Sequence, residues 1–157
     1  GIMDRGQLVQ VDTPRNLYES PKNVFVADFL GMISFIEGRV NNCTKTKLVI
    51  DSQPPITAAL DLQRGPDSQI QAGDQVTLAI RPEKISLSAT ATGVVNEIPI
   101  VVEDLAYLGV ASNYRVKTAQ GHMFKLQQQQ SRRELIPLEW GDNGFIQFDP
   151  ADVIVLL

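Results

Sequence analysis

The residue types most often used in catalysis are scarce in this chain. Its 157 residues include one cysteine, Cys43, and one histidine, His122. A zinc site built from Cys and His needs several such ligands, and a disulfide needs two cysteines. A triad of nucleophile, histidine and acid would have to use His122, which follows Gly121 between two predicted strands and is expected in a solvated turn. The sequence therefore excludes an internal disulfide, a Cys/His zinc site and any triad without His122.

Two motifs have a superficial likeness to parts of nucleotide-binding sites. The segment 98–104 is an apolar run that ends in Glu103 and Asp104, as does the metal-holding strand of a nucleotide hydrolase. However, the acids come in the order Glu-Asp, Pro99 interrupts the run, and no glycine is followed by the lysine of a phosphate loop. We therefore expect an edge strand that runs into an acidic turn. The segment 141–144 has the spacing of a nucleotide clamp, but Asp142 would repel phosphate, so we expect a β-turn.

Two further groups of residues leave binding functions open. Arg132 and Arg133 are the only adjacent basic pair, and on a β-rich fold they keep an oligonucleotide-binding module as an alternative. The aromatic content of 6% leaves few rings on which bases could stack. Glu139, Trp140 and Asp142 could bind an organic cation by ion pairing and cation–π contact. The alternative for this tryptophan is an ordinary place in the core or at its rim.

The overall composition is that of a soluble globular protein. Hydrophobic residues make up 43% of the chain and charged residues 20%. Lysine and arginine number 14 against 18 acidic residues, and the net charge of −4 argues against a broad nucleic-acid-binding surface. No apolar run is long enough to cross a bilayer, and the first residues lack the layout of a secretory signal, so we expect a cytoplasmic protein.

The pattern of turns and caps predicts a mainly β fold with a short N-terminal helical segment. Two short strands are expected around the turn 4–6. Thr13-Pro14 and Ser20-Pro21 each place a hydroxyl at a helix N-cap and a proline at the first helical position, which predicts two helices, the second over 21–30. After Gly31 the pattern predicts strands only, at 33–40, 47–51, 56–62, 75–80, 84–88, 98–103, 112–118, 123–127, 144–148 and 152–157. Many short strands separated by turns indicate a small barrel or sandwich.

Several longer motifs resemble the ATP-binding subunits of ABC importers. The segments 3–14, 16–21 and 25–31 resemble the stretch that ends the nucleotide-binding domain in that family. The segments Ile-Arg-Pro-Glu-Lys-Ile at 80–85 and Leu-Ala-Tyr-Leu-Gly at 105–109 resemble markers of its C-terminal β-rich domain, known as the TOBE domain. The resemblance covers essentially the whole chain.

The same resemblance implies a division of the chain and a branch of the family. Residues 1–31 correspond to the end of the nucleotide-binding domain with its linker helices. Residues 32–157 correspond to a TOBE domain with OB-like β-barrel architecture, either as one module or as two intertwined lobes. Tyr-Arg-Val at 114–116 and Trp-Gly-Asp at 140–142 most resemble the branch that imports polyamines, particularly putrescine.

The resemblance implies a role without catalysis. The family's phosphate loop, signature motif, second acidic motif and switch histidine map onto no residue here, so ATP and Mg²⁺ are implied only for a parent protein and no cofactor is expected in this fragment. The domain would hold two subunits together as a two-fold dimer. The parent would be peripheral to the inner face of the bacterial plasma membrane, bound to permease subunits. A polyamine-sensing domain that inhibits transport is the alternative, and no nucleic acid is expected.

The family motifs also supply candidate interface or hinge residues, which are Arg81, Pro82, Glu83, Lys84, Tyr107, Leu108 and Gly109. Arg81 offers a planar fork for a carboxylate, and Glu83 could pair across a subunit or domain boundary. The alternative is that Arg-Pro-Glu only stabilises a local turn between two strands.

Overall fold

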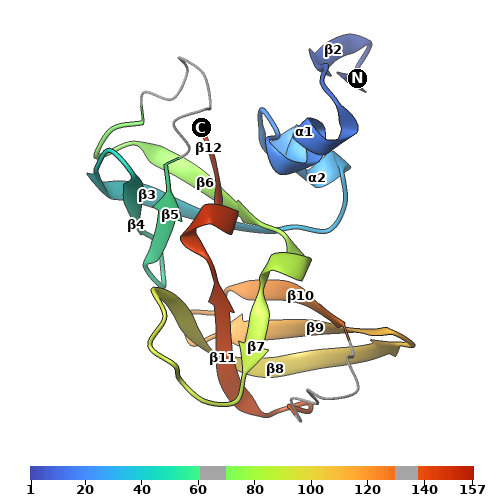
Figure 1. The fold of residues 1–157 in the computed structure, drawn as a ribbon, viewed down its shortest axis with the longest axis vertical. Helices are drawn as coiled ribbons and strands as arrows, with labels where there is room; N and C mark the ends of the chain where they lie inside the picture. Colours follow the sequence, from blue (N-terminus) through green and yellow to red (C-terminus); the bar gives the residue numbers. More distant parts are fainter. Residues whose placement is uncertain (61–69, 130–137) are drawn as a thin grey trace.

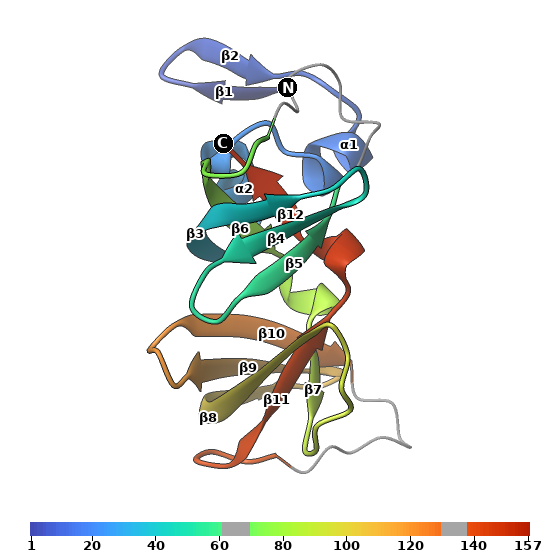
Figure 2. The same ribbon diagram turned by 90° about the vertical axis from the view of Figure 1, so that its left-hand side faces the viewer.

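The computed structural model describes residues 1–60, 70–129 and 138–157, and these form three parts. Two of them are stacked along the long axis of the molecule, and the helices of the third lie beside the upper one (Figures 1 and 2). The first part, here called the N-terminal segment, holds a β-hairpin and two short helices. Its elements are β1 (Ile2–Asp4), β2 (Gln7–Gln10), α1 (Pro14–Glu19) and α2 (Val24–Phe29).

The other two parts are five-stranded antiparallel sheets, here called the first and second lobes. The first lobe has the strand order β12-β6-β3-β4-β5, and the second has the order β10-β9-β8-β11-β7. The strands of the first lobe are β3 (Ser34–Cys43), β4 (Lys47–Asp51), β5 (Ile56–Ala59), β6 (Gln75–Ile80) and β12 (Ile154–Leu156). Those of the second are β7 (Ser86–Ser88), β8 (Asn96–Leu108), β9 (Ala111–Thr118), β10 (Met123–Gln129) and β11 (Asn143–Phe148).

The chain crosses between the lobes twice, so the second lobe is a continuous insertion between β6 and β12 of the first. It leaves the first lobe after β6 through a 3₁₀ turn, η1 (Pro82–Lys84), and returns after β11 through a similar turn, η2 (Pro150–Asp152). Each turn has proline at its start, where a missing N–H costs nothing. An ion pair of 3.1 Å between Lys84 Nζ and Asp152 Oδ1 joins the two crossings.

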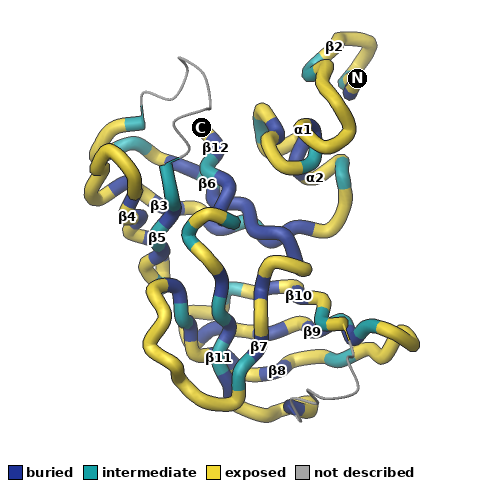
Figure 3. The backbone as a smooth tube through the Cα atoms, viewed as in Figure 1, coloured by how far each residue is buried: buried dark blue, intermediate teal, exposed yellow. Residues whose placement is uncertain are grey.

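One hydrophobic core extends through both lobes. Strands β9 and β10 alternate buried and exposed residues, as expected for sheets with one face inward. A single cluster of buried side chains runs from Ile36 and Leu48 in the first lobe to Phe124 and Ile146 in the second. The N-terminal segment has a separate small cluster, and much of its surface is exposed in Figure 3. The lobes therefore form one packed unit, with the N-terminal segment attached to it.

The mainly β fold with a short helical segment is confirmed. Each of the ten strands predicted after Gly31 corresponds to one of β3 to β12, with differences at the ends. The predicted helix start at Thr13-Pro14 is also confirmed, because the Thr13 hydroxyl accepts a hydrogen bond from the Asn16 N–H at 3.2 Å. The predicted strand 56–62 ends at Ala59, and its last two residues lie outside the described residues.

The predicted start of the second helix is wrong. Ser20 is the C-cap of α1 rather than an N-cap, and its N–H donates to the Asn16 carbonyl. The helix begins three residues after Pro21, at Val24, because the Asn23 side chain accepts from the Val26 N–H at 3.0 Å. An asparagine cap of this kind competes well with serine. A similar shift occurs at 84–88, where η1 occupies the first residue and the strand begins at Ser86.

The predicted edge strand at 98–104 is wrong as well, because β8 lies in the middle of its sheet. Pro99 lies opposite Phe145 of β11 but has no partner on β9, because the pairing of β8 with β9 begins only at Ile100. A proline is tolerated at this position because β8 is paired on one side only. The expected acidic turn is a β-bulge, since the register with β9 shifts between Val102 and Asp104 and the strand continues.

The β-turn predicted at 141–144 lies two residues earlier. The Asp142 N–H donates to the Glu139 carbonyl at 3.0 Å, and Gly141 has a φ of 87°, which suits the third position of a type II turn. Gly144 is instead part of β11. A Cβ at Gly144 would lie 2.8 Å from the Ser88 carbonyl oxygen, so close packing rather than turn geometry requires glycine there.

Candidate functional site

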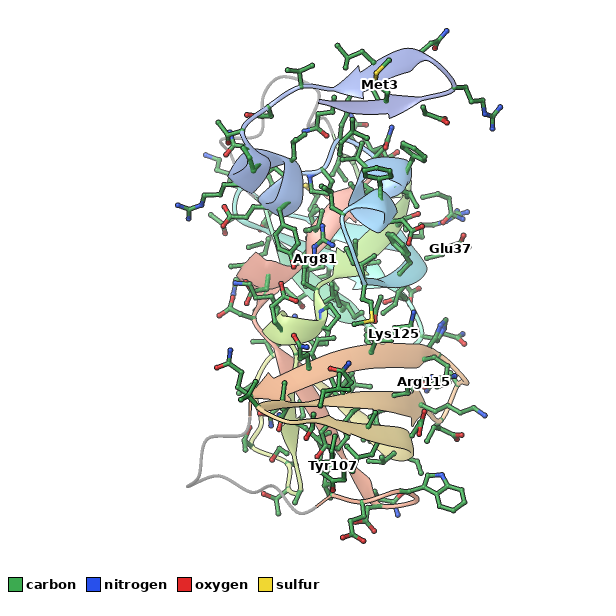
Figure 4. All side chains as sticks on the ribbon, turned by 90° about the vertical axis from the view of Figure 1, so that its right-hand side faces the viewer. Met3, Glu37, Arg81, Tyr107, Arg115 and Lys125 are labelled. Carbon is green, nitrogen blue, oxygen red and sulfur yellow. The ribbon has the colours of Figure 1, made fainter. Side chains whose placement is uncertain are left out.

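Arg81 lies at the junction of all three parts of the molecule. It lies between the end of β6 and the start of η1, and it is 3% exposed. Its guanidinium donates to two backbone carbonyls of the N-terminal segment, from Nη1 to Ala27 at 3.3 Å and from Nη2 to Tyr18 at 3.2 Å. Figure 4 shows Arg81 between the helices and the lobes. A buried charge is thus met by oxygen atoms from both α1 and α2.

The Tyr18 side chain completes the contact, which we call the Arg81 joint (Arg81, Tyr18, Glu83 and the Ala27 carbonyl). The Arg81 guanidinium carbon lies 4.0 Å from the centroid of the Tyr18 ring, a cation–π geometry. The Tyr18 hydroxyl donates a short hydrogen bond to a Glu83 carboxylate oxygen. The Nε of Arg81 is buried and has no hydrogen-bond partner in the described part of the chain. Both Arg81 and Glu83 of the Arg-Pro-Glu motif therefore contact Tyr18 and fix the position of helix α1.

The surroundings of this joint raise the pKa of two side chains. Burial, followed by the hydrogen bond to Glu83, raises the pKa of Tyr18. The hydrogen bond to Asp152 raises the pKa of Lys84 and keeps this side chain charged. Pro82 is buried at the first position of η1, where it fixes the direction of the chain.

The structure does not bring Tyr107, Leu108 and Gly109 together with the Arg81 joint. They lie at the end of β8 and in the two-residue turn to β9, at the far end of the second lobe. Gly109 has a φ of 72° at the first turn position, the conformation that a type II′ hairpin requires there. Tyr107, Leu108 and the following Val110 are 65%, 57% and 84% exposed, so this hairpin tip presents apolar side chains to solvent.

The predicted cation-binding residues occupy the turn before β11. Trp140 is 78% exposed, which excludes a place in the core of this chain. The Asp142 carboxylate accepts a hydrogen bond from the Glu139 N–H at 2.8 Å, so it also stabilises its own turn. The turn is anchored to β8 by the Val102 N–H and carbonyl. An exposed ring thus stands beside two exposed carboxylates on a fixed turn.

Other candidates contribute little to a site. His122 is half-buried in the turn after β9, where its backbone bonds to Thr118. Arg132 and Arg133 lie outside the described residues. Among the residues that the structure does describe, no three His, Cys, Asp or Glu side chains are grouped as metal ligands would be. No helix in the same ranges is long and apolar enough to span a bilayer.

Comparison with protein families gives one match, to the model of the TOBE domain, over residues 78–156. This range is half of the chain and includes η1, the whole second lobe and β12. The chain belongs to the TOBE domain family. The matched range contains Arg81 and Glu83 but not Tyr18, so the Arg81 joint ties the family's characteristic region to the N-terminal segment.

Curated relatives of this TOBE protein are ATP-binding subunits of import systems. The spermidine/putrescine import ATP-binding protein PotA of Thermotoga maritima is 31% identical over 160 residues, which cover 99% of this chain and 42% of the relative. The putrescine transport ATP-binding protein PotG of Escherichia coli is 32% identical over 158 residues, covering 99% and 41%. The chain thus spans about two fifths of the length of these relatives.

The fold of this TOBE protein also occurs in a solved structure. The cytoplasmic molybdate-binding protein ModG, determined with molybdate bound, superposes with a TM-score of 0.68 over 77% of this chain and 93% of ModG. At 14% identity the likeness concerns the fold alone. It supports the OB-like architecture that the resemblance implied.

Replacing Arg81 by methionine should detach the N-terminal segment from the lobes. The substitution removes two charge-assisted hydrogen bonds and the cation–π contact, so we expect a loss of about 2–3 kcal/mol in unfolding free energy. Hydrogen exchange should accelerate in α1 and α2 but not in β9. The matched control is Arg39→Met, an exposed arginine of β3 in the first lobe, which should change stability by less than about 0.5 kcal/mol. Equal effects of the two substitutions would contradict the role of the joint.

Alkaline pH should weaken the joint through Tyr18. Its pKa is higher in the folded protein than in the unfolded chain, so this contribution to stability is complete below about pH 10 and is lost as the pH rises through the folded value. Glu83→Gln should lower the pKa of Tyr18 because it removes a negative charge and replaces a charged hydrogen-bond acceptor by a neutral one. Tyrosinate absorbance, compared with that of Tyr18→Phe, measures this shift, and an unchanged pKa would refute the pairing.

Proposed function

We propose that this chain is the C-terminal regulatory and dimerisation region of the ATP-binding subunit of an ABC importer, and that the imported substrate is putrescine or a related polyamine. The observation that carries the proposal is the alignment with PotA and PotG, which covers 99% of the chain and includes the N-terminal segment as well as the TOBE region. On this proposal the chain performs no catalysis, and ATP and Mg²⁺ bind elsewhere in the longer protein.

The Arg81 joint supports the proposed regulatory role. A regulatory domain must move together with the segment that connects it to the catalytic part, because a slack connection transmits no displacement. Helices α1 and α2 have six residues each and would be marginal alone, so contacts to the lobes must hold them in place. Arg81 and Glu83 provide such contacts from the same turn that joins the two lobes.

The shared core supports the proposed dimerisation role. A domain that keeps two subunits in contact while their catalytic halves separate has to resist deformation. Two sheets with a common core and two linked crossings have little freedom to move against each other. The longer protein would lie at the inner face of the plasma membrane, where permease subunits bind it.

Dimerisation can be tested on the chain as it stands. Sedimentation equilibrium over a range of protein concentrations should reveal a reversible monomer–dimer equilibrium of the 157-residue chain. The same measurement at high salt separates apolar from electrostatic contributions, because salt screens exposed charges. A strictly monomeric species at the highest concentration would count against the dimerisation role.

Polyamine sensing remains the second candidate function, and the exposure of Trp140 favours it. One ammonium group of a diammonium ligand could lie over the Trp140 ring and form an ion pair with a neighbouring carboxylate. Trp140 is the only tryptophan in the chain, so its fluorescence reports on this turn alone. Putrescine should change the fluorescence saturably in physiological salt, and Glu139→Gln should weaken the effect. A flat response at millimolar putrescine would remove this candidate, whereas a response equal to that with NaCl would show screening only.

A further inference from the structure

The outward face of β8, β9 and β10, here called the hairpin face, carries an unusual arrangement of charge. Arg115 and Lys117 on β9 and Lys125 on β10 are exposed, while the residues between them point into the core. The register places Lys125 directly opposite Arg115, and Figure 4 labels both side chains on neighbouring strands. Like charges directly opposite each other on an antiparallel pair destabilise it. The fold therefore holds two cations together at a cost.

The acidic side of the hairpin face lies one strand away. Asp104 on β8 is directly opposite Arg115, and Glu103 is exposed at the neighbouring bulge. The Asp104 carboxylate accepts a hydrogen bond from the Leu105 N–H at 2.9 Å. Within the described residues, Arg115, Lys117 and Lys125 form no ion pair of 4 Å or less, so even the facing Arg115 and Asp104 stay unpaired. The hairpin face is thus divided into an acidic strand and a basic pair of strands.

A surface divided in this way is complementary to itself. A two-fold axis through the boundary between β8 and β9 places the acidic strand of one copy over the basic strands of the other, and the reverse, in one contact. We propose that the hairpin face is the interface through which two copies of this chain associate. The inference rests on the proposed dimerisation and names the surface that performs it.

The apolar residues near these charges also suit contact with a second copy of the chain. On the same outward side, Leu108 lies opposite Ala111 near the hairpin tip, beside the exposed Val110. Dimer interfaces commonly combine an apolar patch with charges that set the register. The described part of the hairpin face carries no aromatic ring on β9 or β10, whereas single-stranded nucleic acid binds by stacking on such rings. The charge pattern therefore fits a second protein copy better than a nucleic acid.

The experiment reverses the charges of each half separately and then combines them. The first variant, Arg115→Glu with Lys125→Glu, makes the face predominantly acidic and leaves Lys117 as its remaining exposed cation. The second, Glu103→Lys with Asp104→Lys, makes it basic. Each alone should raise the dimer dissociation constant at least about tenfold, because like charges then meet across the contact. An equimolar mixture should form a heterodimer within about threefold of the wild-type affinity, since opposite charges then meet at the substituted positions.

The control carries the same change of charge elsewhere. Lys45→Glu with Lys47→Glu alters exposed lysines of the first lobe and should leave the dissociation constant unchanged. If wild-type protein dimerises and neither reversed variant is weakened, the hairpin face is not the interface although the proposed dimerisation stands. If both variants are weakened and their mixture does not restore association, the self-complementary contact is wrong and the face serves a different partner. A monomeric wild type would overturn both proposals.

Discussion

Arg81 carries a positive charge into a position from which solvent is almost entirely excluded. Removing a guanidinium from water costs several kcal/mol unless its donors and its charge are matched. The carbonyls of Tyr18 and Ala27 and the face of the Tyr18 ring supply that match, and all of them belong to the N-terminal segment. The fold can keep Arg81 buried only while α1 and α2 stay in place, so this charge couples the position of the helices to the folding of the lobes.

The two parts of the molecule are therefore stabilised differently. The lobes are stabilised by their own core, and the N-terminal segment is stabilised by its contacts with the lobes. The lobes share an extensive core of large apolar side chains. The N-terminal segment has only Ile2, Leu17 and Val26 as fully buried apolar residues in its own cluster. Helix α2 adds a second attachment, because Ala27 packs with Ala79 of β6 and Ile154 of β12. The helices are thus fastened to β6 and β12 on one side and to η1 on the other.

The sequence predicted the strands well, because alternation of apolar and polar residues follows directly from burial of one sheet face. It failed where local rules competed. Ser20-Pro21 has the pattern of a helix start, but Asn23 provides the cap that the backbone uses. Pro99 argues against a central strand in general, and only the offset between the two neighbouring strands makes it acceptable. Such offsets depend on tertiary pairing, which no single segment reveals.

The candidate site was predictable in part. The Arg-Pro-Glu motif was found through a family resemblance, yet its partners were not, since two of them are backbone carbonyls, which every residue possesses. Tyr18 lies 63 residues before Arg81, and no periodicity connects positions so far apart. Similarly, Lys125 and Arg115 lie opposite each other because of the register of β9 and β10, which the sequence of neither strand reveals by itself.

The insertion of the second lobe between β6 and β12 affects how the chain acquires its structure during synthesis. Strand β12 begins at Ile154, yet it pairs with β6, which ends at Ile80 and forms part of the first sheet. The first sheet is therefore incomplete until β12 has left the ribosome, and the edge of β6 stays open while the second lobe is synthesised. Exposed strand edges during this interval favour pairing with other chains. Strand β12 thus completes the first sheet late, and this sheet cannot be excised as one continuous stretch of sequence, whereas all strands of the second sheet lie between Ser86 and Phe148.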